Sequence, residues 1–325
     1  MVGRPLRSLA YLHAQDAAEP HADSVWAVSW TPFDNATISI SADGTIKRYH
    51  PSSGQLSAQR PAHALGLVSL STSNDGKKAL YNSLEGTTRL WDIESGTLVG
   101  EHESFARGGS GPAWAITLRP QGDAYAATGS SGDVTVHSAD PASFGDTLTT
   151  LSSGRAKFGL RCAYSPDGAR IALGQETGHI FVFDVDAGSL HTTFVTHAMG
   201  IRSLAWSPDS QMLISASEDK RLMVHDVRGG GTGSKGAVAS LAGHTSWVLD
   251  ADVAPDGRLV VSGSADKTIK VWDLATRTAV STVQDSGEVW SVAWQPTTAG
   301  VASGAAFVSG GEDGVVRWWR AAGTA

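Results

Sequence analysis

One segment of the chain carries the three residue types of a hydrolase triad. His244, Ser262 and Asp266 follow one another over a short stretch, and Trp272 comes soon after them. A serine nucleophile needs a histidine to take its proton and a carboxylate to orient that histidine. These residues therefore raise nucleophilic hydrolysis as a first hypothesis.

The same residue types recur along the chain, and this argues against an active site. His63 is followed by Glu85 and Trp91 in comparable order. Two further partial sets are His197 with Asp219, and His21 with Asp43 and Tyr49. An active site is needed only once, so repetition favours a structural role. The sequence leaves open whether Ser262 or Ser264 belongs to the set.

Metal and phosphate chemistry have weaker support. The 11 histidines are spread along the chain, and no H-x-x-x-H or Cys-His cluster exists among them, so we expect no metal and no cofactor. The glycine-rich run at 228–236 lacks the G-K-[ST] ending of a phosphate loop and is interpreted as a flexible surface insertion. Cys162 lies in an apolar stretch and is expected to be inert core.

These residues belong to a repeat that organises the whole chain. The segment SADKTIKVWD at 264–273 has counterparts at 41–50, 83–92, 217–226 and 311–320, with weaker copies at 130–138 and 175–184. An apolar run with a Pro/Asp/Gly turn precedes each copy. Each repeat then reads as four short strands separated by turns. Seven such repeats, with turns 42 to 47 residues apart, cover about 21–320.

Spacing, turns and the Trp-Asp dipeptide together resemble the WD-repeat (WD40) family over roughly residues 20 to 320. The resemblance implies an all-β, seven-bladed β-propeller occupying 1–325 as one domain. It also implies that His244, Ser262, Asp266 and Trp272 form a hydrogen-bonded chain that joins the strands of one blade. His63 and Trp91 are expected to play the same part in the second repeat.

A propeller must close, because otherwise its first and last blades expose strand edges. The last repeat ends at Arg320 and leaves no room for a fourth strand. Residues 1–20 precede the first repeat and include a strand-like stretch from Leu6 to His13. We therefore predict that this stretch is the outer strand of the seventh blade.

Composition limits the other function classes. The chain has 325 residues, a formal net charge of −7 and one cysteine. The acidic balance argues against a broad nucleic-acid surface, and a single cysteine is typical of a reducing compartment. Neither a membrane-spanning apolar run nor a signal-peptide pattern is found. We expect a protein that is monomeric alone, located in the cytoplasm and nucleus.

Large aromatic residues are predicted to surround one end of the propeller axis. The loop that enters each innermost strand opens on this face, so the positions three and five residues after each histidine should line it. Those positions include Trp26, Trp114, Phe158, Arg202, Trp247 and Trp290. Aromatic residues with an arginine are typical of protein-binding surfaces. The alternative is that each tryptophan only fills the channel or packs against a neighbouring blade.

The central repeats at 197–220 and 244–278 resemble the family of small WD-repeat subunits of the superkiller complex, which is related to a subunit of the animal polymerase-associated factor complex. The resemblance implies a non-catalytic scaffold for a tetratricopeptide subunit and a DExH helicase in exosome-dependent mRNA decay. It further implies nuclear work in transcription elongation or meiotic recombination. One departure is that the third, fourth and seventh repeats lack the histidine, with Asp285 in its place in the last. The alternative is a receptor or adaptor in another complex, such as a ubiquitin ligase.

Overall fold

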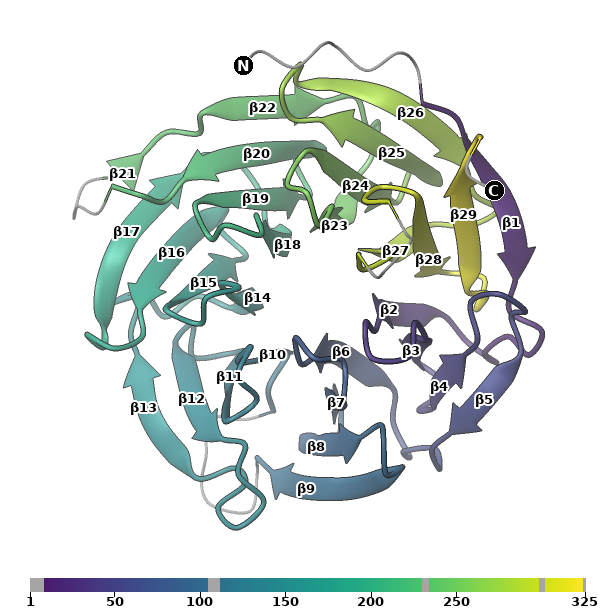
Figure 1. Cartoon of the computed structure of the whole chain (residues 1–325). Coiled ribbons are helices and arrows are strands. Elements are labelled where there is room, and N and C mark those ends of the chain that lie inside the picture. The colour runs from purple at the N-terminus through teal and green to yellow at the C-terminus, as the bar shows by residue number, and fades with distance from the viewer. Residues whose placement is uncertain (1–8, 105–111, 230–233, 298–301, 324–325) are drawn as a thin grey trace.

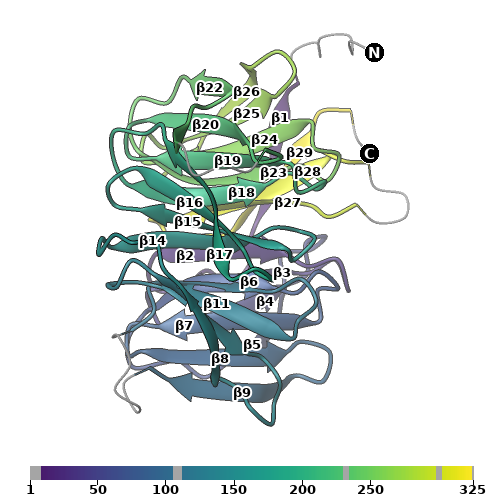
Figure 2. The same cartoon turned by 90° about the vertical axis from the view of Figure 1, so that its left-hand side faces the viewer.

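The structure is a computed structural model that describes residues 9–104, 112–229, 234–297 and 302–323. These residues form seven sheets arranged radially around a common axis, all antiparallel except for one short parallel strand added to the fourth (Figure 1). Figure 2 shows the same ring from the side, turned by 90°. The predicted all-β, seven-bladed propeller is confirmed.

The first four blades are built in chain order from the innermost strand outward. Blade 1 contains β2 (Val25–Trp30), β3 (Thr37–Ser41), β4 (Ile46–Tyr49) and β5 (Leu56–Gln59). Blade 2 contains β6 (Leu67–Thr72), β7 (Lys78–Ser83), β8 (Thr87–Asp92) and β9 (Thr97–Glu103). Blade 3 contains β10 (Ala115–Leu118), β11 (Ala124–Thr128), β12 (Val134–Ser138) and β13 (Thr147–Leu151). Blade 4 contains β14 (Gly159–Tyr164), β15 (Arg170–Gln175), β16 (His179–Asp184), β17 (Ser189–Val195) and the added β21 (Ser234–Lys235).

The last three blades complete the ring. Blade 5 contains β18 (Ile201–Trp206), β19 (Met212–Ser217), β20 (Arg221–Asp226) and β22 (Ala239–Ala242). Blade 6 contains β23 (Val248–Val253), β24 (Leu259–Ser264), β25 (Thr268–Asp273) and β26 (Thr278–Gln284). Blade 7 contains β27 (Val289–Trp294), β28 (Ala306–Gly311), β29 (Arg317–Ala321) and β1 (Tyr11–Asp16).

The turn between the second and third strands explains the recurring Asp-Gly pair. Gly44 has a φ of +80°, and a Cβ there would lie 2.4 Å from the carbonyl oxygen of His63. Glycine is favoured because it lacks that Cβ and adopts positive φ without steric cost. In blades 5 and 6 the same position holds Lys220 and Lys267, whose φ values of 72° and 64° remain in this region. The Asp-Lys variant of the repeat therefore accepts some backbone strain.

Tryptophans pack the blades against one another. Trp30, Trp206 and Trp294 are buried on inner strands, and Trp91, Trp272 and Trp319 are buried on third strands. Trp318, which precedes Trp319 on β29, is also buried. Its Nε1–H donates a 3.1 Å hydrogen bond to the Thr37 hydroxyl, and its ring packs edge-on against Tyr49. Trp318 thus joins blade 7 to blade 1, where the ring closes.

The strand β1 closes the ring from the N-terminal side, as predicted. It pairs antiparallel with β29, so that the last blade contains both ends of the described chain (Figure 1). The predicted limits are wrong, since the strand runs from Tyr11 to Asp16 rather than from Leu6 to His13. Tyr11 is buried against Trp294 and Phe307 and fixes this position. Residues 6–8 of the predicted strand lie outside the described residues.

The glycine-rich segment 228–236 is not simply a loop. Within it, Ser234–Lys235 forms β21, which pairs in parallel with β17 of blade 4. This short strand follows the third strand of blade 5 in sequence, so the insertion reaches back to the preceding blade. Residues 230–233 of the insertion lie outside the described residues.

Candidate functional site

A cavity of about 260 Å³ opens at one end of the propeller axis. Its walls include the residue five positions after the first histidine, or its replacement, in each of the seven repeats. These residues are Trp26, Val68, Trp114, Leu160, Arg202, Leu249 and Trp290. The sequence spacing therefore selects residues that the fold brings to one place.

A backbone irregularity explains why these side chains share a direction. In six inner strands the register skips one residue, as between Val25 and Ala27, which leaves Trp26 unpaired. Such a β-bulge re-aims the extra side chain away from the ordinary alternation of the strand. In each of the six, the skipped residue lines the cavity. The repeated bulge thus builds the mouth of the channel.

The aromatic side chains form a continuous arc. The ring centroids of Trp290 and Trp26 lie 5.2 Å apart, and those of Trp26 and Trp114 lie 5.9 Å apart, both edge-to-face. Phe158 extends the arc by packing 5.9 Å from Trp114. Phe158 does not itself line the cavity. Phe158 therefore supports the Trp114 ring from outside the cavity.

Arg202 and Trp247 lie on the opposite wall. The guanidinium of Arg202 lies 5.4 Å from the Trp247 ring centroid, and its Nη2 lies 2.6 Å from the carboxylate of Glu218. Trp247 is 41% exposed, whereas Arg202 already has a charged partner. Any acidic group of a partner would therefore compete with Glu218 for Arg202. Trp247 offers the more accessible contact surface.

Two charged residues of this cavity were missed by the sequence reasoning. Arg161 and Asp250 each follow the bulge residue by one position, whereas Glu288 stands at the third position after Asp285, which the spacing rule includes. Asp250 accepts hydrogen bonds from the hydroxyls of Ser203 (2.7 Å) and Ser291 (2.8 Å) on the two neighbouring blades. Extending the spacing rule from the fifth to the sixth position would have found Arg161 and Asp250.

The triad residues form a buried hydrogen-bonded chain. His244 Nδ1 lies 2.9 Å from Asp266, His244 Nε2 lies 2.8 Å from the Ser262 hydroxyl, and Trp272 Nε1–H donates to Ser262 at 2.8 Å. Burial alone would raise the pKa of Asp266, but hydrogen bonds from Thr268, the Thr245 N–H and His244 lower it to about 2. Ser262 is fully buried, so no substrate reaches its hydroxyl. Ser264 instead contacts the Ser246 carbonyl.

The chain of hydrogen bonds varies between blades. In blade 5, His197 contacts Asp219 and Ser215, and His225 replaces the tryptophan. In blade 7, Asp285 replaces the histidine and pairs with Arg317 at 2.8 Å. The strands are thus joined through two histidines and a serine in blade 5, and through an ion pair in blade 7.

Blade 2 departs from the prediction. His63 Nε2 lies 2.7 Å from Arg89, and the indole nitrogen of Trp91 has no hydrogen-bond partner within the described chain. The reason is that Tyr81, which pairs with Arg89 as Ser262 pairs with Lys270, replaces the bridging serine. The expected network of His63 and Trp91 is therefore incomplete.

Replacing Ser262 by alanine is expected to lower the free energy of unfolding by about 1–3 kcal/mol. The substitution leaves the buried His244 Nε2 and Trp272 Nε1 without their shared partner. Urea unfolding at pH 7 measures the change. Ser57→Ala, at an exposed serine of outer strand β5, is the control and is expected to change stability by less than about 0.5 kcal/mol. Equal effects of the two substitutions would contradict the role of the network.

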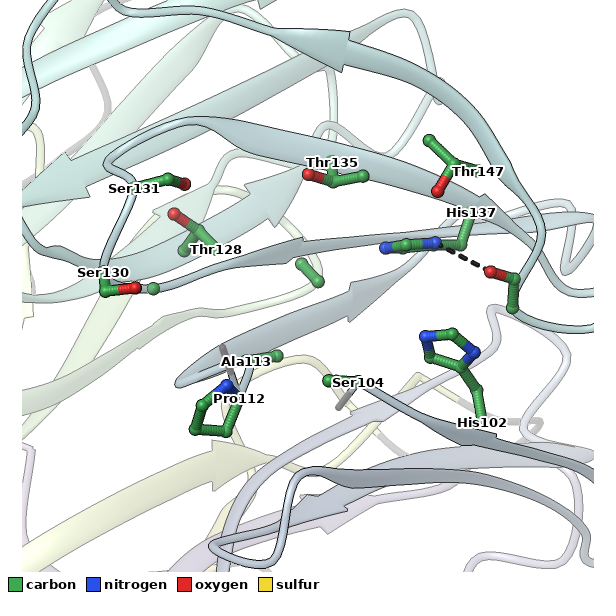
Figure 3. Close-up of a pocket in the computed structure, with 13 residues that line it drawn as sticks. His102, Ser104, Pro112, Ala113, Thr128, Ser130, Ser131, Thr135, His137 and Thr147 are labelled. Atoms are coloured by element: carbon green, nitrogen blue, oxygen red, sulfur yellow. Dashed lines mark hydrogen bonds between the residues drawn. The ribbon is translucent and has the colours of Figure 1, made fainter. Parts of the chain in front are cut away.

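A second cavity, of about 200 Å³, lies between blades 2 and 3 (Figure 3). Its walls are mainly hydroxyl-bearing residues and two histidines, His102 and His137, whose ring centroids are 5.4 Å apart. His137 Nδ1 contacts the Gly145 carbonyl at 3.0 Å, and burial lowers the pKa of His137. In the described part of the chain, no three His, Cys, Asp or Glu residues are grouped to hold a metal ion. The axial cavity is the stronger candidate.

Comparison with known proteins shows the family to which this chain belongs. The family model described as WD domain, G-beta repeat matches residues 188–226, 236–273 and 277–320. The chain belongs to the WD-repeat family, because three of its repeats match this model and more than two thirds of one WD repeat-containing relative aligns with it. That relative is WD repeat-containing protein SL1-17 of Schistosoma mansoni, with 30% identity over 65% of this chain and 69% of the relative.

Two further relatives have similar identities. WD repeat-containing protein VIP3 of Arabidopsis thaliana is 34% identical over 60% of this chain and 64% of its own length. Meiotic recombination protein rec14 of Schizosaccharomyces pombe is 29% identical over 59% of this chain and 63% of its own length. The alignments therefore span less than two thirds of these two relatives. Across the described ranges, no helix has the length and apolar character needed to cross a membrane.

Proposed function

We propose that this protein is a non-catalytic interaction scaffold that captures a partner segment at the axial cavity. The observation that carries the proposal is a cavity lined by all seven repeats, four of which contribute a tryptophan: Trp26, Trp114, Trp247 and Trp290. A surface rich in tryptophan with exposed apolar neighbours is typical of protein-binding hot spots. Ser215 and Ser262 are both fully buried, so the Ser-His-Asp sets of blades 5 and 6 are closed to substrate, which supports a non-catalytic role.

We further propose that the scaffold is the WD-repeat subunit of a superkiller complex, assisting the exosome in cytoplasmic 3′–5′ mRNA decay. The resemblance of residues 197–220 and 244–278 supports this assignment. Its partners are then a tetratricopeptide-repeat subunit and a DExH RNA helicase, with no direct contact to nucleic acid. A relative named as a meiotic recombination protein favours an additional nuclear role. The competing assignment is an adaptor in another complex, such as a ubiquitin ligase.

Affinity purification from cells followed by mass spectrometry tests the assignment. Recovery of a tetratricopeptide protein together with a DExH helicase is the expected result. Recovery of cullin subunits in their place would move the protein to the ubiquitin-ligase class. The purification is repeated after RNase treatment, and partner recovery is expected to remain unchanged because the contacts are between proteins.

Replacing Trp247 and Trp290 by alanine is expected to reduce partner capture at least tenfold. Both side chains line the cavity, and Trp247 is largely free of the core. The same purification measures the loss, with a thermal melt to check folding. The matched control is Leu148→Ala. Leu148 is 60% exposed and lies on β13, the outermost strand of blade 3, away from the axial cavity. Undiminished capture by the double variant would place the binding surface elsewhere.

A further inference from the structure

The charged residues of the axial cavity differ in how well they are satisfied. The lining contains two arginines, Arg161 and Arg202, and two acidic residues, Asp250 and Glu288, so its formal charges balance. Arg202 is paired with Glu218, and Glu288 accepts a 3.2 Å hydrogen bond from the Trp290 indole. Both charged groups are therefore already engaged by the protein.

Asp250 is more completely satisfied than either. Besides the hydroxyls of Ser203 and Ser291, it accepts the backbone N–H of Val292 at 3.0 Å. These contacts join blades 5, 6 and 7 and use both carboxylate oxygens. A carboxylate with three donors has little to gain from a cationic ligand.

Arg161 has the opposite character. Its Nε is shielded from solvent and has no hydrogen-bond partner among the described residues. The residue as a whole is only half-buried and lines the cavity, so its terminal amino groups are open to an occupant. An unsatisfied guanidinium in an apolar setting is costly, and a carboxylate matches its planar donors in a bidentate manner.

We propose that Arg161 binds the carboxylate of an acidic side chain in a partner peptide, while the surrounding aromatic residues hold an adjacent apolar residue. This inference rests on the proposed function of the cavity and specifies the chemistry of its occupant. A volume of about 260 Å³ fits one or two side chains rather than a large small-molecule ligand. The protein is acidic overall, so the preference for an acid arises from contact and not from long-range attraction.

The surroundings of the cavity favour an internal peptide segment over a chain end. Exposed apolar residues occur on the entering loops of three blades, at Leu65 (51%), Met199 (42%) and Trp247 (41%). Blade 2 lies across the axis from blades 5 and 6 (Figure 1). A peptide that crosses the cavity can therefore make apolar contacts on both sides of Arg161.

Capped heptapeptide libraries test this proposal. The central residue is fixed as Glu, Gln or Lys, the flanking positions vary, and labelled full-length protein selects the binders. The expected result is enrichment from the Glu library. For a selected peptide, changing its Glu to Gln should weaken binding about 10- to 100-fold, measured by fluorescence anisotropy. A free-carboxylate version with central Gln tests the chain-end source and should not recover this loss.

Protein variants assign the preference to one residue. In Arg161→Gln the Glu and Gln peptides should bind within about twofold of each other, and Arg161→Lys should retain part of the difference. Arg221→Gln, at an exposed arginine of β20 that does not line the cavity, is the matched control and should keep the full preference. Equal enrichment of the Gln or Lys libraries, persistence of the preference in Arg161→Gln, or absence of any binder overturns the inference. Lys-library binders that depend on Trp247 and Trp290 would overturn the acid preference alone and leave the proposed function standing.

Discussion

Replacing Tyr11 by alanine is expected to lower the free energy of unfolding by about 3–5 kcal/mol, and the melting temperature by roughly 4–8 °C. Tyr11 is 4% exposed and packs 5.1 Å from Phe307, measured between ring centroids. Its hydroxyl also donates a 2.6 Å hydrogen bond to the Gly304 carbonyl. The substitution removes the side chain that anchors β1 in the last blade.

The neighbouring residue provides a matched control. Leu12 lies on the same strand but is 59% exposed, so Leu12→Ala should change stability by less than about 0.5 kcal/mol. Differential scanning calorimetry compares the two variants. Deleting residues 1–16 should lower the melting temperature further than Tyr11→Ala does and promote association, because the edge of β29 is then exposed. A Tyr11→Ala melt equal to that of Leu12→Ala would show that β1 does not hold the ring closed.

The fold could be predicted because its signals are local and repeated. Each turn needs a residue that tolerates positive φ, and the third strands of five blades supply a large buried aromatic residue, so the repeat is visible in the sequence. In blades 3 and 5 a histidine, His137 or His225, takes the place of this residue. The limits of β1 could not be predicted in this way, since the closing strand has no copy elsewhere. They depend on which residue reaches Trp294 and Phe307 across the sheet.

The cavity was only partly predictable for a similar reason. The spacing from the histidine, or from Asp285 in its place, located Trp26 and Trp290, because the bulge occurs at a fixed distance from that position. It also located Trp114, which lines the cavity just before β10 although that strand has no bulge. It did not reveal which charges are satisfied. Glu218 pairs with Arg202, while the Nε of Arg161 has no hydrogen-bond partner in the part of the chain that the structure describes. This difference depends on contacts between strands and loops that no single repeat encodes.

Two titratable groups, the buried His225 and the half-buried Asp252, are expected to change the stability of the protein in opposite directions between pH 7 and pH 5. Burial lowers the pKa of His225 to about 3, from 6.5 for a free histidine. Below pH 6.5, His225 therefore becomes protonated in the unfolded chain but stays neutral in the folded protein. The stability of the protein consequently falls as the pH falls. Burial raises the pKa of Asp252 to about 7, from 3.8, although Trp294 N–H hydrogen-bonds its carboxylate. Here the folded protein gains the proton first, so stability rises as the pH falls.

Because the two contributions cancel in part, variants separate them better than the wild-type profile does. His225→Phe removes a loss of about 2 kcal/mol between pH 7 and pH 5, so its stability should fall less than that of the wild type. Asp252→Asn removes a gain of about 1–2 kcal/mol over the same range, and the lower limit allows for the partial exposure of Asp252. The stability of this variant should therefore fall more between pH 7 and pH 5 than that of the wild type. Asp266 does not contribute to this range, because its stabilisation is lost only below pH 3.8.

Urea unfolding at pH 7, 6 and 5 measures all three proteins. Each variant is compared with itself across pH, so a constant packing defect at either site does not affect the result. Parallel pH profiles for the two variants would contradict the assignment of opposite charge states to these groups.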